Sequence, residues 1–263
     1  MGMLRAIWIY RFFIFSSIKN ELRLRFIRSK LGGLWLIIQP LAQVLILSLI
    51  LSTVLSAKLP GINNKFAYAL YLLAGTLAWN LFNEMVTKFV TLFVDNASSM
   101  KKVAFPRICL PAIAAGTVLV NNLLLLGAVF LVFAFLGHLP ERQALWLPLL
   151  IAVNLLFSVA IGMILAVINV FVRDTAQLVP VIMQALFWLT PIVYMLSILP
   201  EGYRHYLTYS PVYPLVVSYQ NVLVFGKEPL FLSLFELSVG SLILIGVGLL
   251  LFRRANSEMV DVL

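Results

Sequence analysis

Charge is scarce in this sequence. Only 11% of the 263 residues are Asp, Glu, Lys or Arg, whereas a soluble globular domain carries about 25%. No charged residue occurs from Leu31 to Ala57. A helix formed by the 24 residues Leu34–Ala57 would be about 36 Å long, which exceeds the roughly 30 Å hydrocarbon core of a bilayer. The scarcity of charge therefore excludes an ordinary soluble domain and predicts a protein that crosses a membrane several times.

Reactive groups and energy-yielding motifs are also missing. The single cysteine, Cys109, excludes an internal disulfide and a Cys-rich metal site. The two histidines, His138 and His205, fall in predicted outer loops without metal-ligand spacing. The pair Gly226-Lys227 lacks the preceding glycine and the following Ser or Thr of a phosphate-binding loop. We therefore expect no catalytic residue, metal or cofactor in this chain, and infer that it has no energy source of its own.

Basic residues gather directly before the first long apolar run, in ELRLRFIRSKLGGLWLIIQP (Glu21–Pro40). Under the positive-inside rule such a cluster marks the cytoplasmic face, and Trp35 takes the interfacial position typical of an indole. The net charge of +9 comes mostly from residues that flank membrane segments, so anionic lipid headgroups rather than nucleic acid are the expected partners. The cluster consists of Arg23, Arg25, Arg28 and Lys30.

The predicted fold class is an all-α polytopic membrane protein in which residues 34–263 form one six-span domain. A cytoplasmic N-terminus and six spans place the C-terminus in the cytoplasm as well. Thirteen of the nineteen Lys and Arg residues then lie in cytoplasmic segments and five in outer loops, as the positive-inside bias requires. The spans are expected at about 34–57, 66–94, 109–136, 144–172, 175–199 and 231–252.

Residues 1–33 are predicted to form an amphipathic helix that lies in the membrane interface. Apolar side chains recur at steps of three and four residues, as such a helix requires. Arg11 and Lys19 project close to this stripe, and their long side chains can reach the headgroups. A loose basic tail is the alternative. The stripe consists of Leu4, Trp8, Phe12, Phe15, Ile18, Leu22 and Phe26.

Two connections are longer than a turn: residues 95–107 on the cytoplasmic side and residues 200–230 on the outer side. The outer connection is broken by Pro211 and Pro214, yet it is apolar over 215–225. Two short, re-entrant helices that dip into the outer leaflet would satisfy this pattern, because irregular backbone at membrane depth must be covered by protein or water. Its tyrosines include Tyr203, Tyr206, Tyr209 and Tyr213.

Polar and aromatic side chains interrupt the apolar spans. Glu84 lies deep in the second span with Lys88 one helical turn further on, so a local ion pair is expected, with a role in gating as the alternative. Each amide in a span either bonds a neighbouring helix or faces a wet cavity. Aromatic faces can stack on sugar rings, so an aromatic-lined channel suits a glycan, whereas ordinary aromatic packing is the alternative. The candidate channel residues are Trp35, Gln39, Gln43, Phe187, Trp188 and Tyr194.

Three motifs resemble those of the membrane subunits of ABC-type polysaccharide exporters. They are the basic cluster running into RSKLGGLWLIIQP, then KKVAFPRICLP (Lys101–Pro111) and LTPIVY (Leu189–Tyr194). The number, order and spacing of the spans are also similar to those of this family, whose members move lipid-linked O-antigen, capsular polysaccharide or teichoic acid. Many relatives carry Asn-Pro after the fifth span and an Arg about nine residues later, where this chain has Ser210-Pro211 and Gln220.

The resemblance implies a homodimer in the inner membrane of a bacterium, with both termini cytoplasmic. Two copies of a separate ATP-binding subunit would dock beneath it and would carry ATP and magnesium. The N-terminal helix resembles the interface helix of the family, and the tyrosine-rich outer loop resembles its gate helices. The segment 95–107 resembles the coupling helix that contacts the ATPase, with candidate residues Ser98, Lys101, Lys102, Phe105, Pro106 and Arg107.

The sequence therefore predicts the transmembrane subunit of an ATP-driven exporter, which is not itself an enzyme. Its expected substrate is a lipid-linked polysaccharide, with O-antigen as the first choice. One alternative is an ABC-type exporter of a drug or a free lipid. Another is an integral membrane lipid-linked transferase, which would need acidic metal ligands or a nucleophile near the interface. A self-sufficient channel is the remaining alternative.

Overall fold

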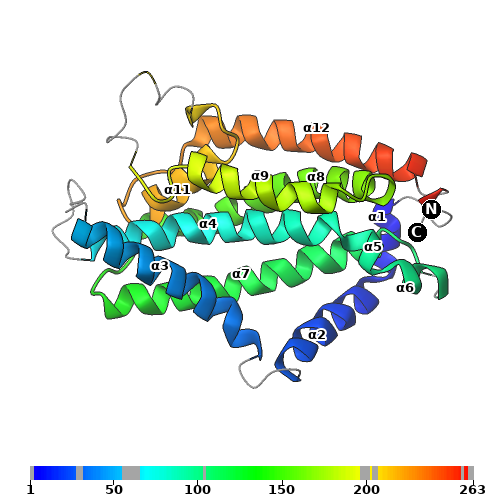
Figure 1. Cartoon of the computed structure of the whole chain (residues 1–263), viewed down its shortest axis with the longest axis horizontal. Helices are drawn as coiled ribbons and strands as arrows, with labels where there is room; N and C mark the ends of the chain where they lie inside the picture. Colours follow the sequence, from blue (N-terminus) through cyan, green and yellow to red (C-terminus); the bar gives the residue numbers. More distant parts are fainter. Residues whose placement is uncertain are drawn as a thin grey trace.

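A computed structural model describes residues 3–27, 32–54, 66–102, 105–195, 202, 207–255 and 258–259, and these residues contain helices and no strand. The long helices run side by side in one bundle (Figure 1). Helix α1 and the C-terminal end of α12 lie at the same end of the bundle as α5 and α6. The helices are α1 Met3–Ile9, α2 Arg11–Ile27, α3 Trp35–Val54, α4 Ala67–Val90, α5 Leu92–Asp95, α6 Ala97–Lys102, α7 Cys109–Phe135, α8 Leu147–Phe171, α9 Thr175–Leu189, α11 Tyr213–Leu223 and α12 Phe231–Ala255.

Three helices of the described chain are long and apolar enough to cross a membrane: α7, α8 together with the 3₁₀ turn before it, and α12. They correspond to the predicted third, fourth and sixth spans. Helices α3 and α9 are apolar but give shorter stretches within the described residues. The all-helical membrane fold is thus confirmed, while the number of six spans stays a prediction.

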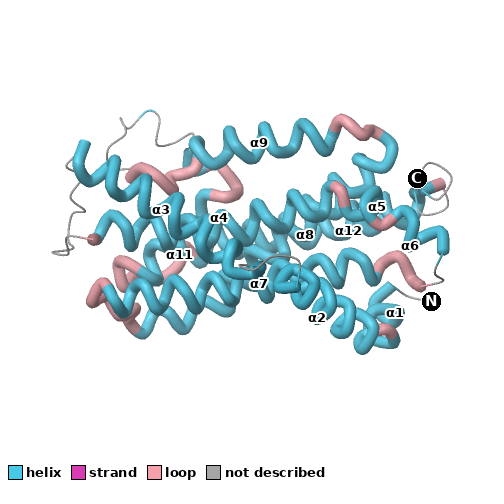
Figure 2. The backbone as a smooth tube through the Cα atoms, turned by 60° about the horizontal axis from the view of Figure 1, so that its bottom comes forward, coloured by secondary structure: helices cyan, strands magenta, loops and turns pink. Residues whose placement is uncertain are grey.

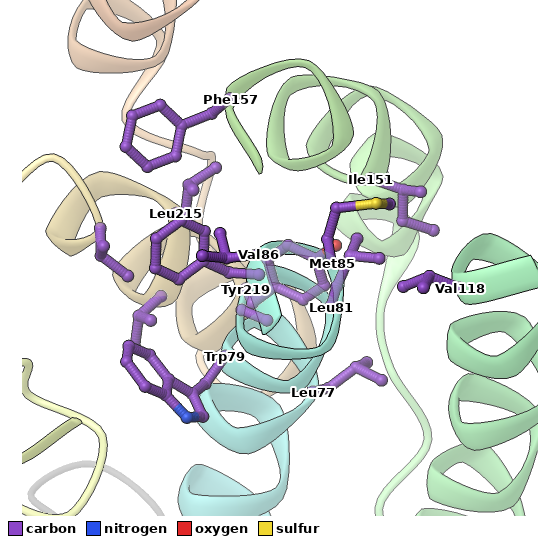
Figure 3. Close-up of a cluster of buried hydrophobic side chains, with 14 of the residues drawn as sticks. Leu77, Trp79, Leu81, Met85, Val86, Val118, Ile151, Phe157, Leu215 and Tyr219 are labelled. Atoms are coloured by element: carbon purple, nitrogen blue, oxygen red, sulfur yellow. The ribbon is translucent and has the colours of Figure 1, made fainter. Parts of the chain in front are cut away.

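Helix α4 is the centre of the bundle. Of its 24 residues, 18 are buried, and it packs against α3, α7, α8, α9 and α11. This central position shields the polar residues of α4 from lipid, as ionisable residues at membrane depth require. Figure 3 shows side chains of α7, α8 and α11 gathered around it, with Val118, Ile151, Phe157, Leu215 and Tyr219 facing Leu77, Trp79, Leu81, Met85 and Val86 of α4.

Two asparagines of α8 join that helix to the backbone of α4. The Asn154 side chain donates to the carbonyl of Ala78 at 2.9 Å, and the Asn169 side chain donates to the carbonyl of Val90 at 2.9 Å. Both asparagines are almost completely buried. Of the two roles open to a span amide, these two side chains therefore take the first, a hydrogen bond to a neighbouring helix.

Helices α4 and α8 pack tightly at Gly162. A Cβ atom at this position would lie 2.7 Å from the Cβ atom of Phe89 and 2.9 Å from its Cγ atom. We expect Gly162→Ala to destabilise the protein by about 1–3 kcal/mol, because the buried Phe89 ring has no room to retreat. Thermal unfolding of the chain in detergent micelles measures the effect. Gly127→Ala is the matched control, because a Cβ there meets no atom within 4 Å, and equal midpoints for the two variants would contradict the prediction.

The predicted fifth span, 175–199, is wrong in its helical extent, because α9 ends at Leu189 after 15 residues. The residue before a proline avoids the α conformation, and Thr190, before Pro191, is extended with φ −93° and ψ 140°. At 1.5 Å per residue, α9 is only about 22 Å long. Figure 2 shows it along one edge of the bundle.

The chain after α9 turns back into the bundle. The Pro191 carbonyl accepts hydrogen bonds from the Tyr71 hydroxyl at 2.9 Å and from the Gln220 side chain at 3.0 Å. The Tyr68 hydroxyl donates to the carbonyl of Val193. Residues of α4 and α11 thus hold this segment in place, and Gln220 occupies a structural position that the sequence pattern did not assign to it.

Three other boundaries differ from the predicted ones. The second span, predicted over 66–94, breaks at Thr91 into α4 and α5, and the N-terminal helix breaks at Tyr10 into α1 and α2. The fourth span, predicted over 144–172, begins with the 3₁₀ turn Arg142–Trp146 and continues as α8 from Leu147. In the outer connection, α11 covers most of the apolar stretch 215–225, residues 200, 201 and 203–206 lie outside the described residues, and the two short re-entrant helices stay a prediction.

Candidate functional site

A groove of about 620 Å³ lies between α3, α4, α7 and α9. Five of the six predicted channel residues line it, although they come from two helices far apart in the sequence: Trp35, Gln39, Gln43, Phe187 and Trp188. Tyr194, the sixth, is not part of its lining; its hydroxyl donates to the carbonyl of Leu189 at 3.0 Å. The structure thus brings the aromatic and amide candidates of α3 and α9 together.

Aromatic rings form one wall of the groove. The Trp79 ring of α4 lies 5.6 Å from the Phe187 ring, which lies 5.5 Å from the Trp188 ring. Trp79 and Phe187 are buried, whereas Trp35 and Trp188 are each 52% exposed. The buried pair fixes the wall, and the two exposed indoles offer flat surfaces at its rim on which a sugar ring can stack.

Two asparagines of α7 bring buried hydrogen-bond acceptors to the lining of the groove. The Asn121 side chain of α7 donates to Glu84 Oε1 of α4 at 2.6 Å, and the Asn122 side chain donates to the carbonyl of Leu77 at 3.3 Å. Both asparagines are 3% exposed. Their Oδ1 atoms are buried and accept no hydrogen bond from the residues that the structure describes. A ligand that brings donors fits this end of the groove.

The candidate channel residues chosen from the sequence did not include the polar residues of α4 and α7. Asn80, Asn83, Glu84 and Thr87 all line the groove, and their spacing of three and four residues puts them on one face of α4. This spacing was the sequence signal that could have assigned these residues to one polar face. The pairing with α7 depends on the packing of two helices about 37 positions apart, which a single sequence does not show.

A second polar cluster lies beside the groove and involves the N-terminal helix. Lys88 Nζ lies 2.5 Å from Glu21 Oε1 of α2, and the Thr117 hydroxyl of α7 donates to Glu21 Oε2 at 2.9 Å. The sequence predicted Glu84 as the partner of Lys88 and did not predict Glu21. Helix α2 also sits tightly on α7, because a Cβ on Gly116 would lie 2.3 Å from the Ile18 side chain.

The predicted interface-helix residues can be placed in part. Arg23 is exposed on α2 and Arg25 belongs to the same helix, whereas Arg28 and Lys30 lie outside the described residues. Three members of the predicted apolar stripe are 70–74% exposed within this chain: Trp8, Phe12 and Phe15. This is the arrangement that an interface helix needs in order to present apolar side chains to lipid.

The predicted coupling residues lie at the same end of the bundle as α1. Ser98 and Lys101 are exposed on α6, whose last residue is Lys102. The ring of Phe105 lies 5.6 Å from the ring of Phe13 on α2, so this segment touches the N-terminal helix. Pro106 and Arg107 accept backbone hydrogen bonds at the start of α7.

The predicted outer-gate tyrosines are placed in part. Tyr209 is 72% exposed, and Tyr213 is the first residue of α11. Tyr203 and Tyr206 lie outside the described residues.

A family model described as ABC-2 type transporter matches residues 13–224, and this match includes all four helices of the groove. The chain belongs to the ABC-2 type transporter family. The family membership confirms the predicted resemblance and explains the apolar helical bundle. Its members are transport permeases, in agreement with a chain that is not an enzyme.

Relatives of this ABC-2 chain include named export permeases. The O-antigen export system permease protein RfbA of Klebsiella pneumoniae is 28% identical over 260 residues, which cover 97% of this chain and 96% of the relative. The protein of the same name from Myxococcus xanthus is 27% identical and covers 98% of each chain. The polysialic acid transport protein KpsM of Escherichia coli is 23% identical over 92% of each chain.

Proposed function

We propose that this chain is the membrane subunit of an ATP-driven exporter that moves a lipid-linked polysaccharide, O-antigen, across the cytoplasmic membrane. The observation that carries the proposal is similarity over nearly the whole chain to O-antigen export permeases of two organisms. The groove supports it, because exposed indoles and side-chain amides suit a sugar chain that must bind and slide. The proposed topology has six spans, with both termini in the cytoplasm.

The proposed complex contains two copies of this chain and two ATP-binding subunits, which hold the ATP and magnesium. The α5–α6 segment receives the movement of the ATPase. Phe105 then passes it to α2 through Phe13, and Glu21 passes it to α4 through Lys88. Because α4 forms one wall of the groove, a displacement at the cytoplasmic end changes the width of the groove.

Deletion of the gene tests the function. We expect polymer to disappear from the cell surface and full-length lipid-linked polymer to accumulate inside, because synthesis continues while export stops. Immunoblots of surface and intracellular polymer measure both quantities. Expression of the wild-type chain should restore the surface polymer. Unchanged surface polymer, or loss of intracellular synthesis as a transferase would cause, contradicts the proposal.

A further inference from the structure

We infer that the groove holds two successive units of an extended sugar chain, which lies parallel to α4 and α9 with one ring at Trp188 and the next at Gln184. This inference rests on the proposed function and deepens it by naming the length and the direction of the polymer segment that one chain binds. It is carried by lining groups that recur one helical turn apart on α4 and α9.

The directions of α4 and α9 follow from two sets of contacts. The Asn169 side chain of α8 donates to the carbonyl of Val90 at 2.9 Å and accepts from the backbone N–H of Ala176 at 3.1 Å, so the end of α4 lies near the start of α9. Eleven residues back along α4 and eleven residues on along α9, the Trp79 and Phe187 rings lie 5.6 Å apart. The two helices therefore run side by side and antiparallel (Figure 1).

This antiparallel register sorts the lining residues into two levels. Trp79 of α4 and Trp188 of α9 share an aromatic level, because the Phe187 ring contacts both. Asn83 follows Trp79 by four residues, and Gln184 precedes Trp188 by four. Residues four apart share one face of a helix. Both amides therefore lie one turn closer to α5, about 6 Å from the aromatic level.

The spacing of the two levels matches that of a sugar chain. A pyranose unit built from single bonds of about 1.5 Å is about 5 Å long between its two glycosidic oxygens. A ring stacked on the half-exposed Trp188 indole thus places the next ring beside Asn83 and Gln184. The Asn83 side chain is partly exposed and the Gln184 side chain is exposed, and a carboxamide both donates and accepts hydrogen bonds, as sugar hydroxyls do.

The length of the groove limits the segment to two units. Its lining runs from Trp79 to Thr87 on α4 and from Pro180 to Trp188 on α9, which is about 12 Å along each helix. Two sugar units of about 5 Å each occupy this length. Beyond Trp188, the surface between α3 and α9 is lined mainly by apolar side chains, which offer further units few hydrogen bonds.

Binding of fragments of increasing length tests the inference. The full-length chain, in complex with its ATP-binding partner in lipid nanodiscs, is titrated calorimetrically with fragments of one, two, three and four sugar units. The fragments are prepared by mild acid hydrolysis of the surface polymer of the same strain. We expect two units to bind at least tenfold more tightly than one, because the second ring adds the contacts of the second level. A third or a fourth unit should each add less than twofold.

Variants of α9 test the two levels separately. Gln184→Ala and Trp188→Ala should each reduce the ratio of two-unit to one-unit affinity at least fivefold, because each removes the contacts of one ring. Trp188→Phe keeps a flat aromatic face and should stay within twofold of the wild-type ratio. Gln177→Ala is the matched control, because it removes the same amide from an exposed position of α9 outside the groove lining and should leave the ratio unchanged.

The outcomes are distinct. If one and two units bind equally, if affinity rises steadily up to four units, or if no fragment binds, the inference is wrong even when deletion of the gene abolishes export. A role of Gln184 confined to helix packing would lower the unfolding temperature of Gln184→Ala without changing the ratio, which also contradicts the inference. If deletion of the gene leaves surface polymer intact, the proposed function itself fails.

Discussion

Lys88→Glu is expected to reduce polymer export more than tenfold. Lys88 Nζ lies 2.5 Å from Glu21 Oε1, and their side chains are only 19% and 34% exposed. Breaking a buried ion pair by removing one partner costs about 3–5 kcal/mol; partial exposure of Glu21 reduces this to about 2 kcal/mol. The new carboxylate would also stand one helical turn from Glu84. Surface polymer and the thermal midpoint of the purified chain measure the two effects.

The charge-swapped double variant Glu21→Lys with Lys88→Glu tests whether export requires the ion pair itself. It restores opposite charges across α2 and α4, and the Thr117 hydroxyl can accept a hydrogen bond from the new ammonium. We expect it to recover at least half of the export lost in Lys88→Glu. Arg142→Glu, a charge reversal at an exposed residue remote in sequence from both, is the control and should export normally. A double variant no better than Lys88→Glu would show that the ion pair is not what export requires.

Lys101→Glu combined with Phe105→Ala is expected to abolish binding of the ATP-binding subunit and to remove more than 90% of export. Lys101 is exposed on α6, where charge reversal affects docking. The Phe105 ring contacts Phe13 of α2, and its loss separates the docking segment from the N-terminal helix. Co-purification of the ATP-binding subunit and surface polymer are the measurements.

The single variants distinguish loss of docking of the ATP-binding subunit from loss of the contact between Phe105 and α2. Phe105→Ala alone should retain most binding of the ATP-binding subunit but lose export, because only the contact to α2 is removed. The control combines Lys227→Glu, in a predicted outer loop, with Phe66→Ala, at the first residue of the predicted second span, where Phe66 is 51% exposed. If the Lys101→Glu, Phe105→Ala protein binds the subunit and exports normally, the coupling assignment is wrong.

Long apolar helices could be predicted from sequence with accurate bounds. The predicted span 109–136 is α7, Cys109–Phe135, and the predicted span 231–252 is contained in α12, Phe231–Ala255. Such helices are apolar on every side, because lipid or other apolar helices surround them. Their ends are marked by charge, as Arg253 and Arg254 in the last turn of α12 illustrate.

Features that depend on tertiary contacts could not be predicted. The sequence spacing indicated Glu84 as the partner of Lys88, but Glu21, 67 positions away, reaches Lys88 because α2 lies across α7. The fifth span continues as an apolar pattern beyond Leu189, yet Pro191 ends its helix and buried hydrogen bonds hold the following segment. Five channel candidates met in one groove because α3 and α9 flank α4, an arrangement that periodicity alone does not reveal.

The Pro191 carbonyl, which accepts two hydrogen bonds, ties three parts of the bundle together. Because the Tyr71 hydroxyl and the Gln220 side chain both donate to it, the segment that follows α9 is joined to α4 and to α11 at the same point. A displacement of this segment away from either helix would have to break one of these buried hydrogen bonds.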